Sequence, residues 1–210
     1  MDRNDFMIFK WGKILWPLAA FSIFLSGCND LTEKKAKREA TAEEMYLSAD
    51  AKLKDNLNAE AASLFAAVER QYPYSEWAKK SLLMSAIANH NGAFYEESRA
   101  DAERYLDFYP ADVDAAHAQY LIALSYYDQI DNVSRDQSVT FSALQAFRTV
   151  IERYPNSEYT SPSLLKFDLS LDHLAGAEME VGRYYLKRGH FGAAISRFRV
   201  VVEEFETTSH

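Results

Sequence analysis

The sequence predicts an all-α fold, a solenoid of about four helix–turn–helix repeats over residues 41–210. Seven glycines and five prolines in 210 residues are fewer than a fold rich in tight turns needs. From residue 41 onward, apolar residues recur at helical spacing, as at Ala61, Leu64, Phe65 and Val68. A pattern of small, aromatic and proline residues also returns along the chain. An ordinary helical bundle with helix-ending prolines is the alternative interpretation.

Composition narrows the class of protein. Hydrophobic residues make up 48% of the chain and aromatic residues 14%, which is enough for a buried core and excludes wholesale disorder. The formal charge of −8 disfavours a nucleic-acid-binding surface, so nucleic acid is not an expected partner. One cysteine excludes an internal disulfide and a thiolate-rich zinc site.

The N-terminal residues 1–27 are predicted to be a lipoprotein signal peptide. The apolar run from Ile14 to Leu25 is 12 residues long, too short to span a bilayer but typical of the hydrophobic region of a secretory signal. It ends in Leu25-Ser26-Gly27-Cys28, which resembles the bacterial lipobox. The resemblance implies lipidation of Cys28 by acyl chains such as palmitate and anchoring in a membrane. An uncleaved anchor helix with a chance cysteine is the alternative.

Residues 28–40 are expected to connect the lipidated cysteine to the folded domain as a flexible tether. They are polar and show no apolar periodicity. Asn29, which follows the cysteine, favours sorting to the outer membrane over retention in the inner membrane.

The repeats become visible when Pro73, Pro110, Pro155 and Glu206 are placed in one column. Twelve residues before each column member stands a small residue: Ala61, Ser98, Ala143 and Ala194. Eight residues before it stands a phenylalanine in three of the four repeats: Phe65, Ala102, Phe147 and Phe198. The small residue lets two helices approach closely, the aromatic ring fills the space between them, and proline ends the second helix because it lacks an N–H. The predicted repeats cover residues 41–75, 76–112, 113–160 and 161–210.

Local features modify this pattern in the second half of the chain. Residues 128–137 are predicted to form an insertion loop, and the stretch from Tyr159 to Leu174 a lengthened helix. Gly182 is expected to permit close helix packing and Gly189 to serve a turn. The repeats resemble tetratricopeptide repeats, but their spacings of 37, 45 and 51 residues exceed the usual period of about 34.

Four segments narrow the resemblance further: RDQ at 135–137, IERYPNSEY at 151–159, LAGAEMEVGRYYLKRG at 174–189 and AAISRF at 193–198. With the lipobox, they resemble the BamD family of lipoproteins of the outer-membrane β-barrel assembly machinery, the BAM complex. The resemblance implies a non-enzymatic scaffold, lipid-anchored to the outer membrane on its periplasmic face. It also implies docking on BamA and other subunits, and help in recognising and inserting unfolded outer-membrane proteins.

Two other functions remain open at this stage. One is a generic periplasmic tetratricopeptide adaptor lipoprotein for envelope or division partners, and the other is a cell-wall enzyme. No helical zinc-protease motif, phosphate-binding glycine loop or catalytic constellation is recognisable in the sequence, so we expect no enzyme, no metal and no cofactor.

The resemblance also suggests a partner-binding region near the C-terminus. Arg197 matches the family's arginine near the BamA contact. Arg183, Lys187 and Arg188 form a basic cluster that could meet an acidic patch on the partner or balance neighbouring carboxylates. Family members normally continue with a fifth repeat, which is expected to begin where this chain stops at His210.

A peptide-binding groove is expected on the concave wall formed by the first helix of each repeat. Tyrosine and asparagine side chains suit such a groove because they stack on an extended peptide and bond its backbone. The alternative is that most of these tyrosines pack between repeats. The predicted residues are Tyr46, Asp50, Leu83, Ile87, His90, Asn91, Tyr120, Leu124 and Tyr127.

Overall fold

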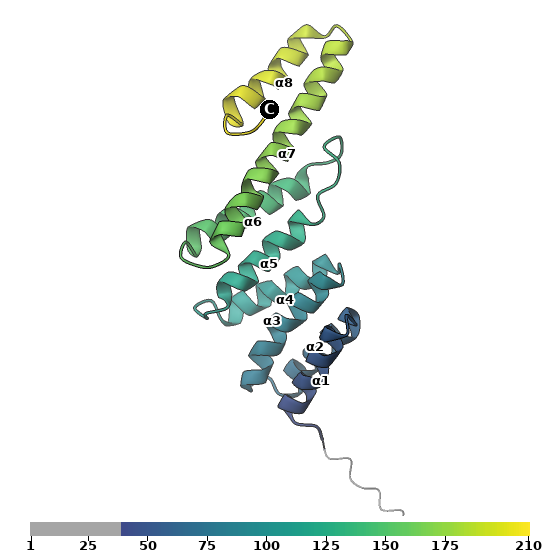
Figure 1. Ribbon diagram of the computed structural model, residues 1–210, viewed down its shortest axis with the longest axis vertical. Coiled ribbons are helices and arrows are strands. Elements are labelled where there is room, and N and C mark those ends of the chain that lie inside the picture. The colour runs from purple at the N-terminus through teal and green to yellow at the C-terminus, as the bar shows by residue number, and fades with distance from the viewer. Residues whose placement is uncertain (1–38) are drawn as a thin grey trace, which may run out of the picture. The chain divides into compact units, whose positions relative to one another are not determined.

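A computed structural model describes residues 39–210, so the predicted signal peptide, Cys28 and nearly all of the predicted tether lie outside the described residues. The described part holds eight α-helices and no strand, which confirms the all-α prediction (Figure 1). The helices are α1 (Ala42–Lys54), α2 (Asn58–Gln71), α3 (Glu76–Asn91), α4 (Tyr95–Phe108), α5 (Ala115–Tyr127), α6 (Ser138–Arg153), α7 (Thr160–Lys187) and α8 (Phe191–Glu204).

Consecutive helices stack in sequence order, as in a tetratricopeptide-like solenoid. Each helix packs on the next one along the chain. The odd-numbered helices also contact one another, α1 with α3, α3 with α5 and α5 with α7, whereas no two even-numbered helices of residues 39–210 touch. The odd-numbered helices therefore form the inner layer of the stack (Figure 1). We call the side they present the inner surface.

The core repeats with the sequence pattern. The small residues Ala61, Ser98 and Ala143 have no exposed surface, and Ala194 is 1% exposed. Phe65 and Phe147, four residues further on, are fully buried between the helices of their pairs. The small residue permits close approach of two helix backbones, and the ring then fills the space beside it at the density of a protein interior.

The second helix of every pair ends in the same geometry. The residues that follow α2, α4 and α6 are Tyr72, Tyr109 and Tyr154, with φ near −130° and ψ of 55°, 53° and 50°. Each precedes a proline, which cannot continue the helix. α8 ends in the same way at Phe205, with φ −125° and ψ 36°, although Glu206 follows. Proline therefore favours the end of the second helix, but α8 shows that the helix ends in the same backbone geometry without a proline.

The fourth pair departs from the others because α7 is 28 residues long. Its N-terminal half packs on α5 and α6, and its C-terminal half packs on α8, which contacts no other described helix (Figure 1). Gly182 allows this contact, since an added Cβ would lie 2.4 Å from Cε1 of Phe198. The chain then returns to α7, where Ser209 donates from its amide and hydroxyl to Asp172 Oδ1 at 2.9 and 2.8 Å.

The structure confirms the predicted insertion loop and the predicted turn at Gly189. Residues 128–137 connect α5 to α6 as a loop. Within the loop the Gln137 side-chain amide donates to the carbonyls of Val133 and Arg135 at 3.2 and 2.9 Å. Gly189 adopts φ +77° in the turn between α7 and α8, a conformation that favours glycine.

An ion pair joins the start of the second repeat, on α3, to the turn between α4 and α5. Lys79 Nζ lies 2.7 Å from Asp112 Oδ2, and Tyr105 donates its hydroxyl to Asp112 Oδ1 at 2.7 Å. The hydrogen bond from Lys79, together with those from the Asp114 amide and the Tyr105 hydroxyl, lowers the pKa of Asp112 to about 2.

We predict that Gly182→Ala lowers the free energy of unfolding by about 1–3 kcal/mol, because the new methyl group overlaps the Phe198 ring. Chemical denaturation followed by circular dichroism measures this change. Gly192→Ala is the matched control, since a Cβ there meets nothing within 4 Å and the helical preference of alanine is the same. Equal effects of the two substitutions would contradict the packing argument.

A second prediction concerns acid stability. Because the pKa of Asp112 is lower in the folded chain than its ordinary 3.8, its stabilising contribution is complete above that value and disappears as the pH falls towards about 2. We expect Asp112→Asn to lower stability at neutral pH and to flatten the stability profile between pH 4 and pH 2, relative to the wild type. Denaturation midpoints across this range test it, and an unchanged slope would rule out the role of Asp112.

Candidate partner-binding surfaces

The predicted groove residues lie on α1, α3 and α5, which form the inner surface. Most are half-buried, and Asn91 at the end of α3 is exposed. Leu83 is a correction. It is only 7% exposed and belongs to the core shared by α3, α4, α5 and α6, because it faces the partner helices rather than the inner surface.

The aromatic groove residues hold neighbouring repeats together. The ring of Tyr46 on α1 lies 4.9 Å from that of Trp77 on α3. The ring of Tyr120 on α5 lies 5.2 Å from that of Tyr159, which precedes α7. Packing between repeats, the alternative considered for these tyrosines, is therefore what the structure shows for both.

Polar side chains make similar links along the inner surface. His90 Nε2 on α3 lies 3.1 Å from Asp128 Oδ2 at the end of α5. The Lys166 ammonium group on α7 lies 4.1 Å from the centre of the Tyr127 ring. Asp50 is bound by Lys54 on its own helix at 2.6 Å. Ile87 and Leu124 pack against the core with part of their surface open.

A second candidate surface lies on α7 and α8, around Arg197. Nη1 of Arg197 on α8 donates to both carboxylate oxygens of Glu178 on α7, at 2.9 and 3.2 Å. The side chains are 46% and 27% exposed, respectively. The pair therefore joins the two helices while leaving one face of the guanidinium group open to a partner.

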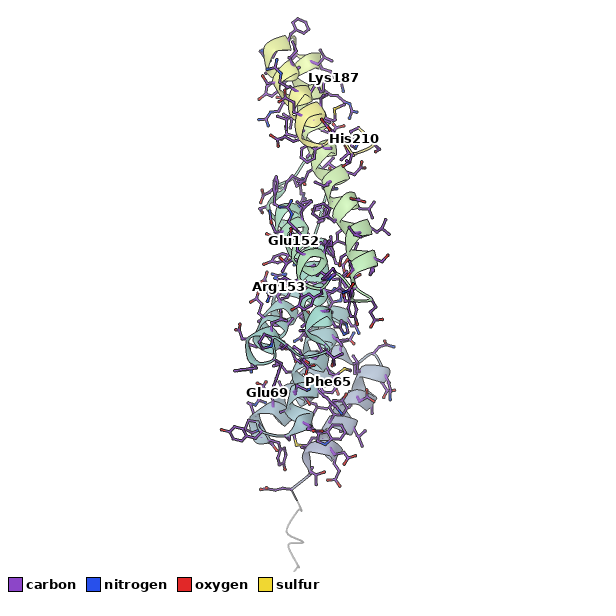
Figure 2. The ribbon with its side chains drawn as sticks, turned by 90° about the vertical axis from the view of Figure 1, so that its left-hand side faces the viewer. Phe65, Glu69, Glu152, Arg153, Lys187 and His210 are labelled. Carbon is purple, nitrogen blue, oxygen red and sulfur yellow. The ribbon has the colours of Figure 1, made fainter. Side chains whose placement is uncertain are left out.

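The predicted basic cluster is only partly available. Arg183 is paired with Glu180 at 3.0 Å, and the Arg188 guanidinium group lies 4.3 Å from the centre of the Tyr184 ring. Lys187 is exposed at the C-terminal end of α7, far along the stack from Phe65 (Figure 2). The structure thus favours charge balance for Arg183 and leaves Lys187 as the more accessible cation.

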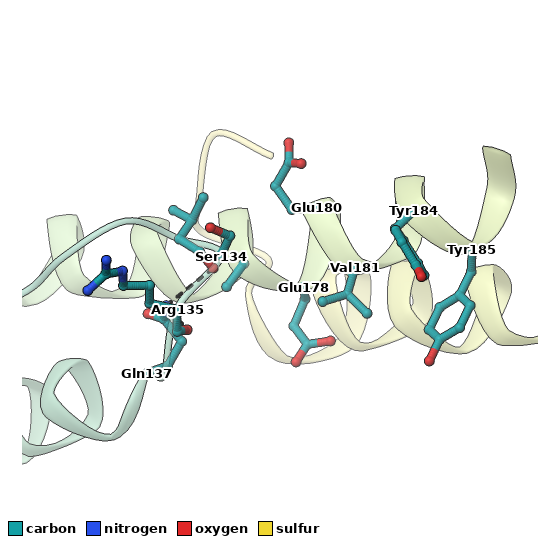
Figure 3. A pocket seen from close by; sticks show the side chains of 10 residues that line it. Ser134, Arg135, Gln137, Glu178, Glu180, Val181, Tyr184 and Tyr185 are labelled. Atoms are coloured by element: carbon teal, nitrogen blue, oxygen red, sulfur yellow. Dashed lines mark hydrogen bonds between the residues drawn. The ribbon is translucent and has the colours of Figure 1, made fainter. Parts of the chain in front are cut away.

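A cavity of about 480 Å³ opens between the 133–137 loop and the C-terminal half of α7 (Figure 3). Figure 3 shows Tyr184 and Tyr185 from α7 on one side and Arg135 with Gln137 from the loop on the other. Its lining residues are Val133, Ser134, Arg135, Gln137, Ala177, Glu178, Glu180, Val181, Tyr184 and Tyr185. Because Glu178 also binds Arg197, the cavity and the ion pair form one continuous surface.

This cavity is absent from the sequence predictions. It forms between residues about 45 positions apart, so no local periodicity reports it. The available signal was the RDQ segment at 135–137, whose Gln137 shapes the loop.

Exposed apolar side chains also lie on α7 and α8, the two helices that the ion pair joins. These side chains are of types usually buried in a protein core, but here they are exposed to solvent. Contiguous exposed apolar side chains are typical of interaction surfaces. They are Val181, Tyr184, Leu186, Phe191, Ile195 and Val202. With Arg197, Glu178 and the cavity, they define what we call the C-terminal surface.

Residues 39–210 contain no group of three or more His, Cys, Asp or Glu side chains placed to hold a metal ion. No helix in this range is long and apolar enough to cross a membrane.

Comparison with known proteins gives a consistent match. The model of the YfiO family, described as an outer membrane lipoprotein, matches residues 38–210. A protein of Caulobacter vibrioides named outer membrane protein assembly factor BamD is 49% identical over 151 residues, which are 72% of this chain and half of that protein.

Two further relatives carry the same name. The protein of Rickettsia prowazekii is 37% identical over 203 residues, covering 96% of this chain and 80% of the relative. The protein of Neisseria gonorrhoeae is 27% identical over 214 residues, covering 94% and 79%.

We predict that Arg197→Glu changes the free energy of unfolding by about 1 kcal/mol or less, because exposed ion pairs contribute little to stability. Arg199→Glu, an exposed residue of the same helix, is the control. Urea denaturation of both variants measures the difference. A much larger loss in Arg197→Glu alone would show that the pair supports the fold itself.

Proposed function

The chain belongs to the YfiO family of outer membrane lipoproteins, alongside the BamD assembly factors that it matches, and from this premise we propose that it is a non-enzymatic assembly factor for outer-membrane proteins. The observation that carries the proposal is the match to the Rickettsia prowazekii assembly factor, which is 37% identical over 96% of this chain and 80% of the relative. The helical stack supports a scaffold role, because stacked helix pairs offer long surfaces for partners.

We further propose attachment to the outer membrane through lipid on Cys28, on the periplasmic side. The lipobox-like Leu25-Ser26-Gly27-Cys28 supports this, as does the description of the family as outer membrane lipoproteins. Each methylene buried in the bilayer contributes about 0.8 kcal/mol, and one acyl chain gives only reversible binding. Two or more acyl chains on the same cysteine therefore anchor a protein stably.

The C-terminal surface is the proposed docking site for BamA. Within residues 39–210 the hydrogen bonds of Arg197 start from Nη1, which leaves Nη2 and Nε for a carboxylate of the partner. Val181 and Tyr184, which line the cavity together with Glu178, supply exposed apolar area that becomes buried on binding. Lys187 lies on the same helix as Glu178 and adds a second cation for an acidic partner.

The inner surface is the proposed binding site for segments of unfolded outer-membrane proteins. Tyr46, Tyr120 and Tyr127 are held by their neighbours, so their ring faces are already ordered before a peptide arrives. Asn91 supplies an exposed amide for backbone hydrogen bonds. The ordered rings reduce the entropy lost on binding.

We predict that Arg197→Glu reduces capture of BamA at least tenfold, since it reverses the charge that the C-terminal surface offers to the partner's carboxylate. Pull-down of BamA from solubilised membranes by the full, lipidated protein measures this. Arg153→Glu, with the same charge change at an exposed residue of α6 outside the C-terminal surface, should capture BamA at the wild-type level.

Equal capture by wild type and Arg197→Glu would refute the assignment of the surface. If the wild type captures no BamA and cells depleted of the protein still assemble outer-membrane barrels, the proposed function itself is wrong. Capture of envelope or division proteins instead would then favour the adaptor role.

A further inference from the structure

The polypeptide enters the helical stack at one particular edge. Ala40 precedes α1, and the hydroxyl of Tyr72 donates to the Ala40 carbonyl oxygen at 2.6 Å. Tyr72 lies in the turn between α2 and α3. The N-terminal entry point is therefore attached to the edge formed by the turns that lead from one pair of helices to the next. We call this the proline edge, since Pro73, Pro110 and Pro155 lie in these turns.

The part of the proline edge nearest this entry point presents apolar side chains to solvent. Tyr74, two residues after Tyr72, is completely exposed. Phe108 and Val113, which flank the next turn, are 63% and 89% exposed. The ion pair between Lys79, in the first turn of α3, and Asp112 joins the start of α3 to the next turn at 2.7 Å, so the three side chains lie on the same edge. These three side chains form the edge patch.

We propose that the edge patch rests on the headgroup region of the membrane that holds the lipid anchor. This inference relies on the proposed lipidation of Cys28. The 12 residues from Asn29 to Ala40 can span at most about 40 Å. The end of the proline edge at Tyr72 is therefore held within about 40 Å of the lipid anchor. A tether of this length gives a millimolar effective concentration, so a weak patch is enough for contact.

The chemistry of the edge patch suits a membrane interface. Tyrosine and phenylalanine bring apolar rings, and tyrosine adds a polar end that stays at headgroup level. The residues that flank the patch in the sequence carry charges of both signs, Arg70 and Lys80 against Glu76, Asp107 and Asp114. Attraction to anionic lipid is therefore not the cause of contact. The patch should bind a zwitterionic surface, with little dependence on salt.

A built-in probe lies beside the patch. Trp77 is the only tryptophan after Cys28, and it lies three residues beyond Tyr74. Its ring is 4.9 Å from that of Tyr46, and the Lys80 ammonium group is 4.8 Å from its centre. Trp77 fluorescence therefore reports whether this edge approaches lipid.

The test uses the full, signal-processed lipoprotein in phosphatidylcholine vesicles, with and without lipids brominated near the headgroup. We expect bromine to quench Trp77 in the wild type, at low and high salt alike. The variant Tyr74→Ser/Phe108→Ser/Val113→Ser should lose most of the quenching while keeping its circular dichroism spectrum and melting temperature, because all three side chains are exposed. The control Leu57→Ser/Phe94→Ser alters exposed apolar residues in the turns at the other ends of the helices, about 20 Å away, and should be quenched like the wild type.

Flotation with vesicles separates this inference from the anchoring it rests on. Wild type should float, and the same chain beginning at Asn29, which has neither the signal peptide nor the lipidated cysteine, should not. If the wild type floats but Trp77 is not quenched, or if the triple variant is quenched equally, the edge patch does not contact the membrane and only this inference fails. If quenching disappears at high salt, the contact is electrostatic and the proposed mode of membrane contact is wrong.

If the wild type does not float, lipid anchoring fails and the inference fails with it. A triple variant that loses BamA capture, in a protein whose Trp77 is not quenched, would mark the edge as a protein interface instead.

Discussion

Close approach of the two helices in each pair is the constraint on which the rest of the structure depends. A small residue, Ala61, Ser98, Ala143 or Ala194, occupies the same buried position in every second helix. Because the backbones can meet there, the neighbouring ring or aliphatic side chain fills the remaining space without leaving a cavity. The distance between the two helices of a pair also determines where the odd-numbered helix of that pair contacts the next pair. It therefore determines the position of the inner surface.

The C-terminal surface follows from a break in that regularity. α7 continues for 28 residues, so its second half extends beyond α5 and α6 and carries α8 as its sole described helical neighbour. Side chains that an adjoining pair would cover in the middle of the stack are exposed here, including Ile195 and Val202. The 133–137 loop reaches the same stretch of α7 and closes one side of a cavity. Helix length therefore produces both the exposed area and the cavity of this surface.

The inner surface shows how packing and binding share residues. Tyr46, Tyr120 and Tyr127 join consecutive repeats, and each keeps part of its ring open. Residues that link repeats are held in one orientation, which is the condition for ordered contacts with a flexible peptide. Stability of the stack and recognition on its inner side thus use the same aromatic groups, whereas the edge patch serves neither and remains free for another contact.

The sequence by itself determined the fold class, the helical repeats with their buried small and aromatic residues, the insertion loop and the roles of Gly182 and Gly189. These follow from local periodicity and backbone preference, which neighbouring residues report directly. The tertiary structure alone decided that Leu83 is buried, that Arg197 is bound by Glu178, and that a cavity lies between the 133–137 loop and α7. Each of these depends on contacts between side chains that are far apart in the sequence. Helical spacing shows on which face of its own helix a residue lies, but it does not show which residue of another helix or loop packs against it.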